Sequence, residues 1–294
     1  MRDASIAHIR VDTELIASTC ELIASADETT LRFGDLVLRP ADISAVWYRR
    51  PMAIQVAGDG DRYDRAFAAA EWTAAIEGFL NQIPRRRWIN HPAAIVGASA
   101  KLEQLKRAKD HGLSVPEWCC TSRSEHAANF VREHRHVIAK PLYAGYIERG
   151  APAADTVIYT TRVTIDEVEA AGPNLGAPTL FQAEVVGGAD VRITVVDDEA
   201  VAVRMSRDGG DVDIRKQNMI GVSYAAQQLP AQLHDVVRGL VRSYGLRFAA
   251  LDMMFVDANW YFLEINPNGQ WAWLDLVGGT EIYRAFIETL KAAS

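Results

Sequence analysis

The spacing of apolar residues predicts a chain that mixes helices with paired strands. Apolar residues recur at helical spacing in four segments, which we expect to be helices: 61–80, 99–111, 122–134 and 231–244. Shorter β-prone runs bounded by turn-forming residues predict the strands, at 43–48, 88–90, 136–142, 157–162, 179–186, 191–196, 200–205, 251–256 and 260–265. Helices and hairpins do not alternate strictly, which favours an α/β (α+β) architecture with more than one lobe.

The last two predicted strands carry the most informative polar residues. Asp257-Ala258-Asn259 is a turn sequence between them, so the two strands are expected to form a hairpin. With a three-residue loop, Asp252 lies directly opposite Glu264, and Asn266 projects from the same face two residues later. The opposite face is then expected to enter the core, and it holds Met253, Phe255, Tyr261, Leu263 and Ile265.

Two carboxylates that face each other on a sheet repel, so this pair needs a cation close by. Two carboxylates and an amide oxygen are hard donors, which suit Mg²⁺ and do not suit Zn²⁺ or copper. Asp252, Glu264 and Asn266 are therefore candidate Mg²⁺ ligands. Two other interpretations stay open, a solvent-facing acidic pair and a pair bridged by an arginine. The turn-forming Asn-Pro-Asn-Gly string that follows favours a site.

Any phosphate group would have to be bound by lysines, because the chain contains neither a GxxxxGK[ST] nor a GxGxxG motif. Lys140 lies in an otherwise apolar strand, where a buried ammonium is costly unless an anion pairs with it. Lys101 lies near the start of a helix, where a cation does not stabilise the helix dipole. The ordinary alternatives are an exposed helix lysine for Lys101 and an edge-strand lysine that extends to solvent for Lys140.

A strand that runs into a glycine-containing segment is a weaker signal. Its residues Gln182, Glu184, Val185 and Val186 offer backbone groups to an adenine edge. Glu184 and Asp190 are candidates to accept ribose hydroxyls. Arg192, a little further on, would face the negative charge that develops during acyl transfer. Taken alone, the same residues also fit an ordinary strand–turn–strand.

Composition and charge exclude several classes of protein. The chain has 31 Lys and Arg against 38 Asp and Glu, a net charge of −7, which argues against a mainly electrostatic nucleic-acid binder. No uncharged apolar run approaches about 18 residues, and charges interrupt the N-terminus, so neither a membrane span nor a signal peptide is expected. Three cysteines without CxxC spacing favour reduced thiols and a cytoplasmic location.

Taken together, these residues resemble the ATP-grasp superfamily. The matching pieces are Lys101, Lys140, the Gln182–Glu184 strand, Asp190-Val191-Arg192 and the acidic hairpin, in the superfamily's order. Within it, the chain is similar to the peptide maturases that make graspetides, the microviridin-type macrocyclases. Three strings carry this closer resemblance: Val46-Trp47-Tyr48-Arg49-Arg50-Pro51, Asn90-His91-Pro92 and Leu263-Glu264-Ile265-Asn266-Pro267-Asn268-Gly269-Gln270-Trp271. Ribosomal-protein glutamate ligases resemble the chain too, through the Asp-Val-Arg and Glu-Ile-Asn pieces, but the Gln-Trp continuation is not expected there.

The resemblance implies an ATP-grasp fold in which two lobes, residues 93–183 and 184–294, clasp ATP. A pre-ATP-grasp α/β lobe at 1–92 would precede them. That lobe is expected to be shortened, because only eight residues precede Ile9-Arg10-Val11-Asp12. The resemblance also implies ATP and Mg²⁺ as cofactors, a precursor peptide of leader and core as the substrate, and possible assembly as a homodimer.

The implied reaction is a ligation through an acyl phosphate. Asp252, Glu264 and Asn266 would hold Mg²⁺ against the phosphates, while Lys101 and Lys140 neutralise the remaining oxygens. Arg192 and Arg215 would steady the oxyanion or bind the acceptor carboxylate, and an ester or amide ring would close in the peptide. The alternatives are a ligase that joins free amino acids or glutamate to an amine, and a non-catalytic ATP-binding module.

Two further parts of the chain enter this hypothesis. Loops at 143–154 and 206–220 are candidate lids, because an acyl phosphate must be kept from water. Trp271 and Trp273 follow the hairpin, and they either line the acceptor pocket or pack in the core.

Overall fold

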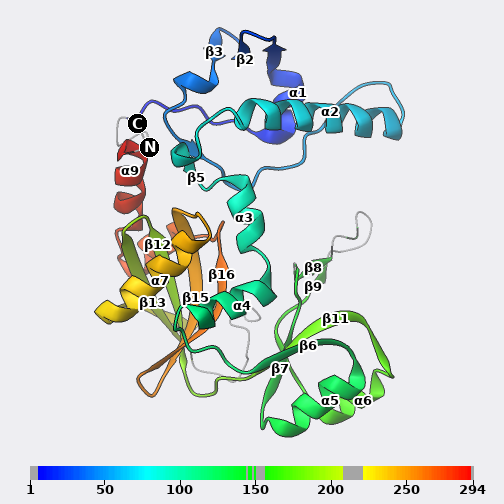
Figure 1. The fold of residues 1–294 in the computed structure, drawn as a ribbon, viewed down its shortest axis with the longest axis vertical. Helices are drawn as coiled ribbons and strands as arrows, with labels where there is room; N and C mark the ends of the chain where they lie inside the picture. The colour runs from blue at the N-terminus through cyan, green and yellow to red at the C-terminus, as the bar shows by residue number, and fades with distance from the viewer. Residues whose placement is uncertain (1–5, 144, 148, 150–155, 208–220, 293–294) are drawn as a thin grey trace.

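The computed structural model describes residues 6–143, 145–147, 149, 156–207 and 221–292. Figure 1 shows three groups of elements: an N-terminal group at the top, a central group at the lower right and a C-terminal group at the lower left. Each group contains its own sheet and its own apolar core. This arrangement confirms the mixed helix-and-sheet class that the sequence predicts.

The N-terminal elements form a small sheet covered by one long helix. Ile16, Leu31, Ile76 and Phe79 are buried together between the sheet and the helices. The sheet has the order β1-β2-β3, and a second, parallel pair joins β4 to β5. The elements are α1 (Ile16–Thr19), β1 (Glu21–Ala24), β2 (Thr29–Phe33), β3 (Leu36–Leu38), β4 (Val46–Trp47), α2 (Arg62–Leu80), β5 (Trp88–Ile89) and α3 (Pro92–Ala98).

The central elements form a four-stranded antiparallel sheet, in the order β10-β7-β11-β6, with two helices on one face. Ala127, Phe130, Val168 and Phe181 are buried between that face and the helices. A two-stranded hairpin, β8 and β9, extends upward from it (Figure 1). The elements are β6 (Trp118–Arg123), α5 (Ser124–Glu133), β7 (Val137–Lys140), β8 (Tyr146–Ile147), β9 (Thr156–Val157), β10 (Thr161–Val163), α6 (Ile165–Ala170) and β11 (Asn174–Ala183).

The C-terminal elements form a five-stranded antiparallel sheet, in the order β14-β13-β12-β15-β16. On one face Ile193 and Leu251 pack against Leu105 and Leu240 of helices α4 and α7. On the other face α8 and α9 cover one part of the sheet. The elements are α4 (Lys101–Asp110), β12 (Ala189–Val196), β13 (Glu199–Arg207), β14 (Val222–Gln227), α7 (Ala231–Ser243), β15 (Phe248–Val256), β16 (Asn259–Asn266), α8 (Ala272–Gly278) and α9 (Ile282–Ala292).

Two sequence predictions of helix ends were wrong. The helix expected at 99–111 begins at Lys101, because α3 precedes it and Ala100 has extended backbone. The helix expected at 122–134 begins at Ser124, because residues 118–123 form strand β6 against β11. At its other end α4 stops where predicted, at Gly112, whose φ of +86° suits glycine.

Asn90 fastens the N-terminal elements to the C-terminal sheet. The side chain is 2% exposed, and its amide nitrogen donates to the carbonyls of Phe248 and Pro267, at 2.7 and 2.9 Å. Its oxygen accepts from the backbone N–H groups of Arg247 and Phe248, at 2.8 and 3.0 Å. The Arg247 side chain also donates to the carbonyl of Arg86. The amide thereby joins both sides of this junction.

An aromatic contact reinforces the same junction. Trp47 of β4 packs 4.8 Å from Phe286 of α9, and its ring centre lies 6.5 Å from that of Trp271. Trp271 itself stacks on Phe286 at 5.2 Å and is 7% exposed. Aromatic pairs of this kind add to the stabilisation that buried area provides. Trp271 is therefore a core residue.

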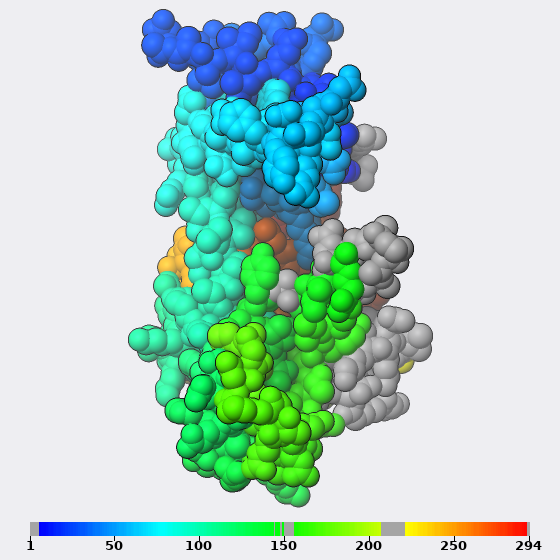
Figure 2. Space-filling model, turned by 90° about the vertical axis from the view of Figure 1, so that its right-hand side faces the viewer, coloured from blue at the N-terminus to red at the C-terminus, as the bar shows by residue number. Residues whose placement is uncertain are grey.

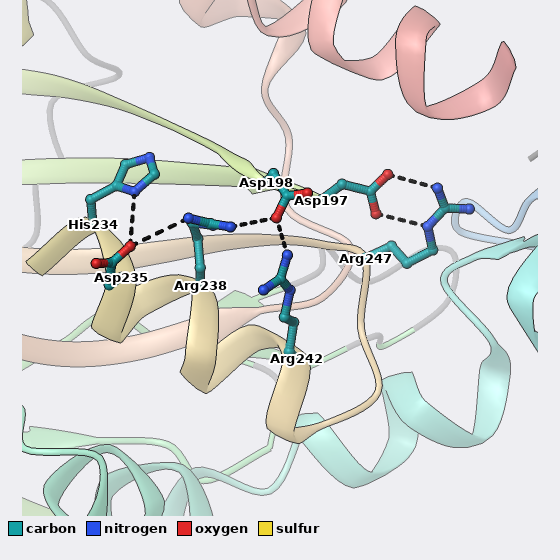
Figure 3. Close-up of polar contacts among 7 residues, drawn as sticks. All are labelled: Asp197, Asp198, His234, Asp235, Arg238, Arg242 and Arg247. Atoms are coloured by element: carbon teal, nitrogen blue, oxygen red, sulfur yellow. Dashed lines mark hydrogen bonds and ion pairs between the residues drawn. The ribbon is translucent and has the colours of Figure 1, made fainter. Parts of the chain in front are cut away.

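An ion-pair network lies at the turn between β12 and β13 (Figure 3). Asp198 accepts from both Arg238 and Arg242 of α7. Its neighbour Asp197 accepts twice from Arg247, at 2.8 and 2.6 Å. Asp197 and Arg247 are half-buried, so their bidentate pair is less screened than a surface pair. The network holds α7 and the start of β15 to one turn of the sheet.

The expectations about membrane spans and about the cysteines can be compared with the structure. Among the described residues, no helix combines the length and the apolar character that crossing a membrane requires. Cys20, Cys119 and Cys120 are free thiols, as the sequence predicts. Burial raises the pKa of Cys119 to about 11, so this thiol stays protonated at neutral pH.

Candidate active site

A cleft of about 1470 Å³ receives residues from all three groups of elements. In Figure 2, C-terminal residues in orange are visible between the N-terminal elements in cyan and the central elements in green. The cleft lining contains every described residue that the sequence marks as a candidate for nucleotide, metal or catalytic contacts: Lys101, Lys140, Gln182, Glu184, Val185, Val186, Asp190, Arg192, Asp252, Glu264 and Asn266. Arg215 lies outside the described residues, as does much of both candidate lid loops.

The predicted pairing of Asp252 with Glu264 is confirmed, although the turn differs from the prediction. The turn has two residues, Asp257-Ala258, both with positive φ (49° and 63°), and Val256 pairs with Asn259. Two-residue turns with positive φ match the twist of a hairpin. A three-residue loop was therefore wrong by one position.

A β-bulge at Leu263 restores the predicted register. Met253 pairs with Phe262, whereas the preceding Asp252 pairs with Glu264, so Leu263 is the extra residue. As a result Phe262 is fully buried in the core, and Leu263 lines the cleft. The prediction that Leu263 enters the core was wrong for this reason, whereas Met253 is buried as expected.

Arg192 pairs with Asp252 across adjacent strands. Its Nε donates to Oδ1 at 2.5 Å, and its Nη2 donates to Oδ2 at 3.1 Å. The two residues are register partners on β12 and β15, which places them side by side. Of the alternatives left open by the sequence, the arginine-bridged pair is thus present for one carboxylate. Arg192 holds Asp252 in place, in addition to any role toward a substrate.

Glu264 has a different set of partners. Lys101 Nζ lies 3.5 Å from its Oε2, and Asn266 Nδ2 donates to its Oε1 at 3.0 Å. Asn266 Nδ2 also lies 3.4 Å from Asp252 Oδ2, so the amide joins both carboxylates. Lys101 is only 21% exposed and donates to the carbonyl of Pro141 at 2.9 Å, so it is not an ordinary exposed helix lysine.

The two carboxylates differ in their affinity for a proton. Burial raises the pKa of Asp252 to about 6; Arg192 opposes this shift and Glu264 adds to it. Burial acts on Glu264 in the same direction, but Lys101 and Lys140 outweigh it, so the pKa of Glu264 lies below its usual range. At neutral pH the site therefore offers two anionic carboxylates to a cation.

Lys140 lies on the second strand of its sheet, between β10 and β11, so the edge-strand alternative is excluded. Its Nζ donates to Gln182 Oε1 at 2.7 Å. Gln182 is fully buried, and its Nε2 makes no hydrogen bond among the described residues. A buried amide N–H of this kind is costly unless an acceptor reaches it. An acceptor atom of a bound ligand, such as an adenine ring nitrogen, would meet this need.

Sequence reasoning missed two residues that organise the cleft. Arg162 of β10 donates twice to Glu184, both times at 2.7 Å, which leaves Glu184 less available to a ribose. Gln104 of α4 is 3% exposed, and its amide pairs with both backbone groups of Ile265, at 3.0 and 3.1 Å. Ile265 lies between Glu264 and Asn266. The signal available in the sequence was the place of Gln104 beside Leu105 and one helical turn before Ala108, on the apolar face of the helix.

The loop after Asn266 is closely packed at Gly269. A Cβ atom there would lie 2.4 Å from the Cβ of Ala250, so Gly269→Ala is expected to displace the loop. We expect roughly a tenfold or greater rise in the Mg²⁺ concentration needed for half-maximal ATP turnover, because loops that support metal ligands tune affinity on this scale. Gly239→Ala is the matched control, since its Cβ would meet only His111 Nδ1 at 3.9 Å. Equal Mg²⁺ dependence in both variants would contradict the expectation.

Comparisons with known proteins match this chain to ATP-grasp proteins. Residues 174–290 match the RimK-like ATP-grasp domain family. The RiPP-associated ATP-grasp ligase of Chryseobacterium gregarium, solved with ADP and a leader and core peptide, is 28% identical, with a TM-score of 0.86 over 97% of this chain and 89% of that one. Macrocyclase MdnC of Microcystis aeruginosa, bound with precursor peptide MdnA, is 24% identical, with a TM-score of 0.81 over 97% and 91%.

A curated relative of this chain is a glutathione synthetase. The glutathione synthetase of Coxiella burnetii is 27% identical over 220 residues, which cover 70% of this chain and 64% of that enzyme, less than two thirds of its length. The fold is that of the ATP-grasp ligase structures, and residues 174–290 match a RimK-like ATP-grasp domain.

ATP-grasp ligases use ATP with Mg²⁺, and the donor set of the cleft fits this pair. Among the described residues, no group of three or more His, Cys, Asp or Glu could hold a metal ion. Asp252 and Glu264 supply two carboxylates, and Mg²⁺ is commonly held by one or two carboxylates together with substrate phosphates. Asn266 now directs its amide nitrogen at both carboxylates, so its amide must turn before its oxygen can act as a ligand.

Proposed function

We propose that this chain is an ATP-dependent ligase that activates a side-chain carboxylate of a precursor peptide and closes an ester or amide ring. The observation that carries the proposal is the facing pair Asp252 and Glu264, with Lys101 beside it, in an ATP-grasp cleft. The similarity to a ligase solved with a leader and core peptide, over nearly the whole chain, supports a peptide acceptor.

The reaction has two balanced steps. A peptide carboxylate oxygen bonds to the γ-phosphorus of ATP, and the bond to the β-phosphate oxygen breaks, which gives an acyl phosphate and ADP. A Ser or Thr hydroxyl, or a Lys amine, of the same peptide then attacks the acyl carbon. Phosphate leaves, the nucleophile loses its proton, and an ester or amide remains. The sum of both steps removes one water from the peptide for each ring.

The residues of this chain have separable roles in that chemistry. Bound Mg²⁺ would neutralise phosphate charge, with Asp252, Glu264 and the turned amide of Asn266 as its protein ligands. Lys101 and Lys140 lie close enough to Glu264 to lower its pKa, and they would approach the phosphate oxygens from the same side. Arg192, already fixed by Asp252, would bind the acyl oxygen or the acceptor carboxylate.

The adenine end of the nucleotide would lie against the segment that follows β11. Gln182, Val185 and Val186 line the segment where β11 leaves the central sheet, and Gln182 supplies the buried N–H that lacks an acceptor. Glu184 is held by Arg162, which makes it a weaker candidate for a ribose hydroxyl. Trp273 lines the cleft and packs on Tyr224 at 5.5 Å, so of the two tryptophans after the hairpin it is the one that would contact the acceptor.

A second candidate function is ligation of free amino acids, which the similarity to a glutathione synthetase favours. The same nucleotide residues would serve, and only the acceptor would differ. A non-catalytic ATP-binding module is less consistent with the cleft, because binding alone does not require two facing carboxylates, two lysines and Arg192 together.

Mass spectrometry can test the peptide-ligase function. The full chain would be incubated with Mg-ATP and with synthetic peptides that combine Thr, Lys and acidic residues. We expect ADP release that depends on the peptide, and a peptide product lighter by one water for each ring. ADP release with glutamate or another free amino acid, and an unchanged peptide mass, would support the second candidate. ATP binding without any acceptor-dependent ADP release would contradict both ligase functions.

A further inference from the structure

The chain segment that follows β4 is docked on the loop that follows the candidate metal ligand Asn266. Arg49 Nη1 donates to the carbonyl of Asn268 at 3.4 Å, and its guanidinium lies 5.9 Å from the ring centre of Trp47. With its amide turned to satisfy its neighbours, Asn268 donates to the carbonyl of Tyr48 at 3.2 Å. The backbone on both sides of this contact is therefore fixed.

Arg50 comes next and has an unfavourable backbone conformation. Its φ is 46°, in the left-handed region that side chains other than glycine rarely adopt. Pro51 follows, and a residue before proline favours extended backbone. Such outliers persist where surrounding contacts hold them, and they cluster at functional sites. The contacts of Arg49 supply that hold here.

Arg50 lines the cleft, as do Asn268 and Gly269 of the loop that Arg49 contacts. It makes no hydrogen bond or ion pair with the rest of the described chain. The other cations near the candidate metal ligands are matched: Lys101 pairs with Glu264, and Arg192 pairs with Asp252. Burial lowers the pKa of the adjacent Arg49, and the positive charge of Arg50 lowers it further. This part of the cleft therefore has unbalanced positive charge.

Arg204 also lines the cleft without such a partner among the described residues, but its setting differs. It lies on β13 opposite Val191, which is buried in the core beneath α7. Its backbone is held within the sheet, by β12 at Val191 and by β14 at Ala225, and not by the loop that follows Asn266. Of these two cations, Arg50 is the one whose neighbour, Arg49, contacts that loop.

We propose that Arg50 is a substrate-binding residue that holds an acidic side chain of the acceptor peptide against the Asn268–Gln270 loop. This inference rests on the proposed peptide-ligase function. Under that function Lys101, Lys140 and bound Mg²⁺ would neutralise the nucleotide phosphates, so the guanidinium of Arg50 is left for the acceptor. A guanidinium binds a carboxylate through two parallel hydrogen bonds, which also fixes its orientation.

Kinetics of single variants test the proposal. Arg50→Gln should raise the KM of an acidic synthetic peptide by roughly 10- to 100-fold, the expected loss for a hydrogen bond to a charged group, while the KM of ATP stays within about twofold. Arg50→Lys should recover part of the loss, because it keeps the charge but not the fork. Arg86→Gln is the matched control, since Arg86 is an exposed arginine of the same N-terminal elements that does not line the cleft.

Chemical protection gives a readout that does not need turnover. Phenylglyoxal modifies accessible arginines, and peptide mapping of the full chain reports modification at Arg50. A pool of synthetic Asp- and Glu-containing peptides should slow this modification, whereas the same pool with Asn and Gln in their place should not. Modification of Arg86 should be unaffected by either pool.

The outcomes separate this inference from the proposed function. Protection of Arg50 by Mg-ATP alone, with no further effect of the acidic pool, would assign the residue to phosphate and overturn the proposal. Normal peptide KM in Arg50→Gln, or equal protection by both pools, would also overturn it while leaving the ligase function intact. Protection by the acidic pool without any ring formation would support Arg50 and contradict the proposed function.

Discussion

Glu264→Gln is expected to lower peptide-dependent ADP release by about three orders of magnitude, because metal-assisted charge stabilisation is worth several kcal/mol. Glu264 faces Asp252, and its carboxylate lies 3.5 Å from Lys101 Nζ. The next residue, Ile265, donates its backbone N–H to Gln104, which fixes the strand beside Glu264. Glutamine keeps the size of the side chain and removes its charge. The measurement is the initial rate of ADP formation at saturating Mg-ATP and peptide.

The control for this variant is Glu125→Gln, an exposed glutamate in the first turn of α5 that does not line the cleft. Its rate should match that of the unaltered chain. Circular dichroism and the unfolding midpoint should show that Glu264→Gln is folded. A folded Glu264→Gln with more than about a tenth of the normal rate would remove Glu264 from the metal site.

Asn90→Ala should lower the free energy of unfolding by at least about 3 kcal/mol, because it strands several buried backbone groups at once. The Asn90 amide is the partner of the carbonyls of Phe248 and Pro267 and of the N–H groups of Arg247 and Phe248. Alanine satisfies none of them, and the site is too enclosed for ready hydration. The measurement is the midpoint of urea unfolding.

Asn81→Ala is the matched control, since Asn81 is exposed at the C-terminal end of α2. Its unfolding free energy should change by no more than about 0.5 kcal/mol, as is usual for surface positions. If Asn90→Ala unfolds at the same urea concentration as Asn81→Ala, the junction between the N-terminal elements and the sheet does not depend on this amide.

Local patterns were sufficient to predict the acidic hairpin, because side chains alternate along a strand and the turn lies between the two partners. Even so, the predicted turn was one residue longer than the observed one. The bulge at Leu263 adds one residue to β16 and so restores the predicted pairing of Asp252 with Glu264. Apolar pattern alone does not distinguish Phe262 from Leu263 as the core residue. Only the bulge, which depends on packing across the sheet, decides between them.

Non-local pairing was out of reach of the sequence. Arg192 contacts Asp252 because β12 lies beside β15. Arg162 of β10 reaches Glu184, just after β11, because both strands pair with the same strand, β7. Neither strand order follows from the spacing of apolar residues. The two tryptophans after the hairpin show the same limit, since Trp271 is a core residue and Trp273 lines the cleft.

The junction at Asn90 and Trp47 has a consequence for how the molecule can move. The N-terminal elements and the C-terminal sheet are bonded to each other there, so we expect them to move as one rigid body relative to the central sheet. The N–H of Phe262 in β16 donates to the carbonyl of Ser114 at 2.8 Å. Three residues later, the carbonyl of Glu117, just before β6, accepts from Ala183 at the end of β11, also at 2.8 Å. Glu184 also donates to the carbonyl of His136 at 2.9 Å, so we expect any movement of the central sheet against the rest of the molecule to be concentrated at 115–116 and 185–188.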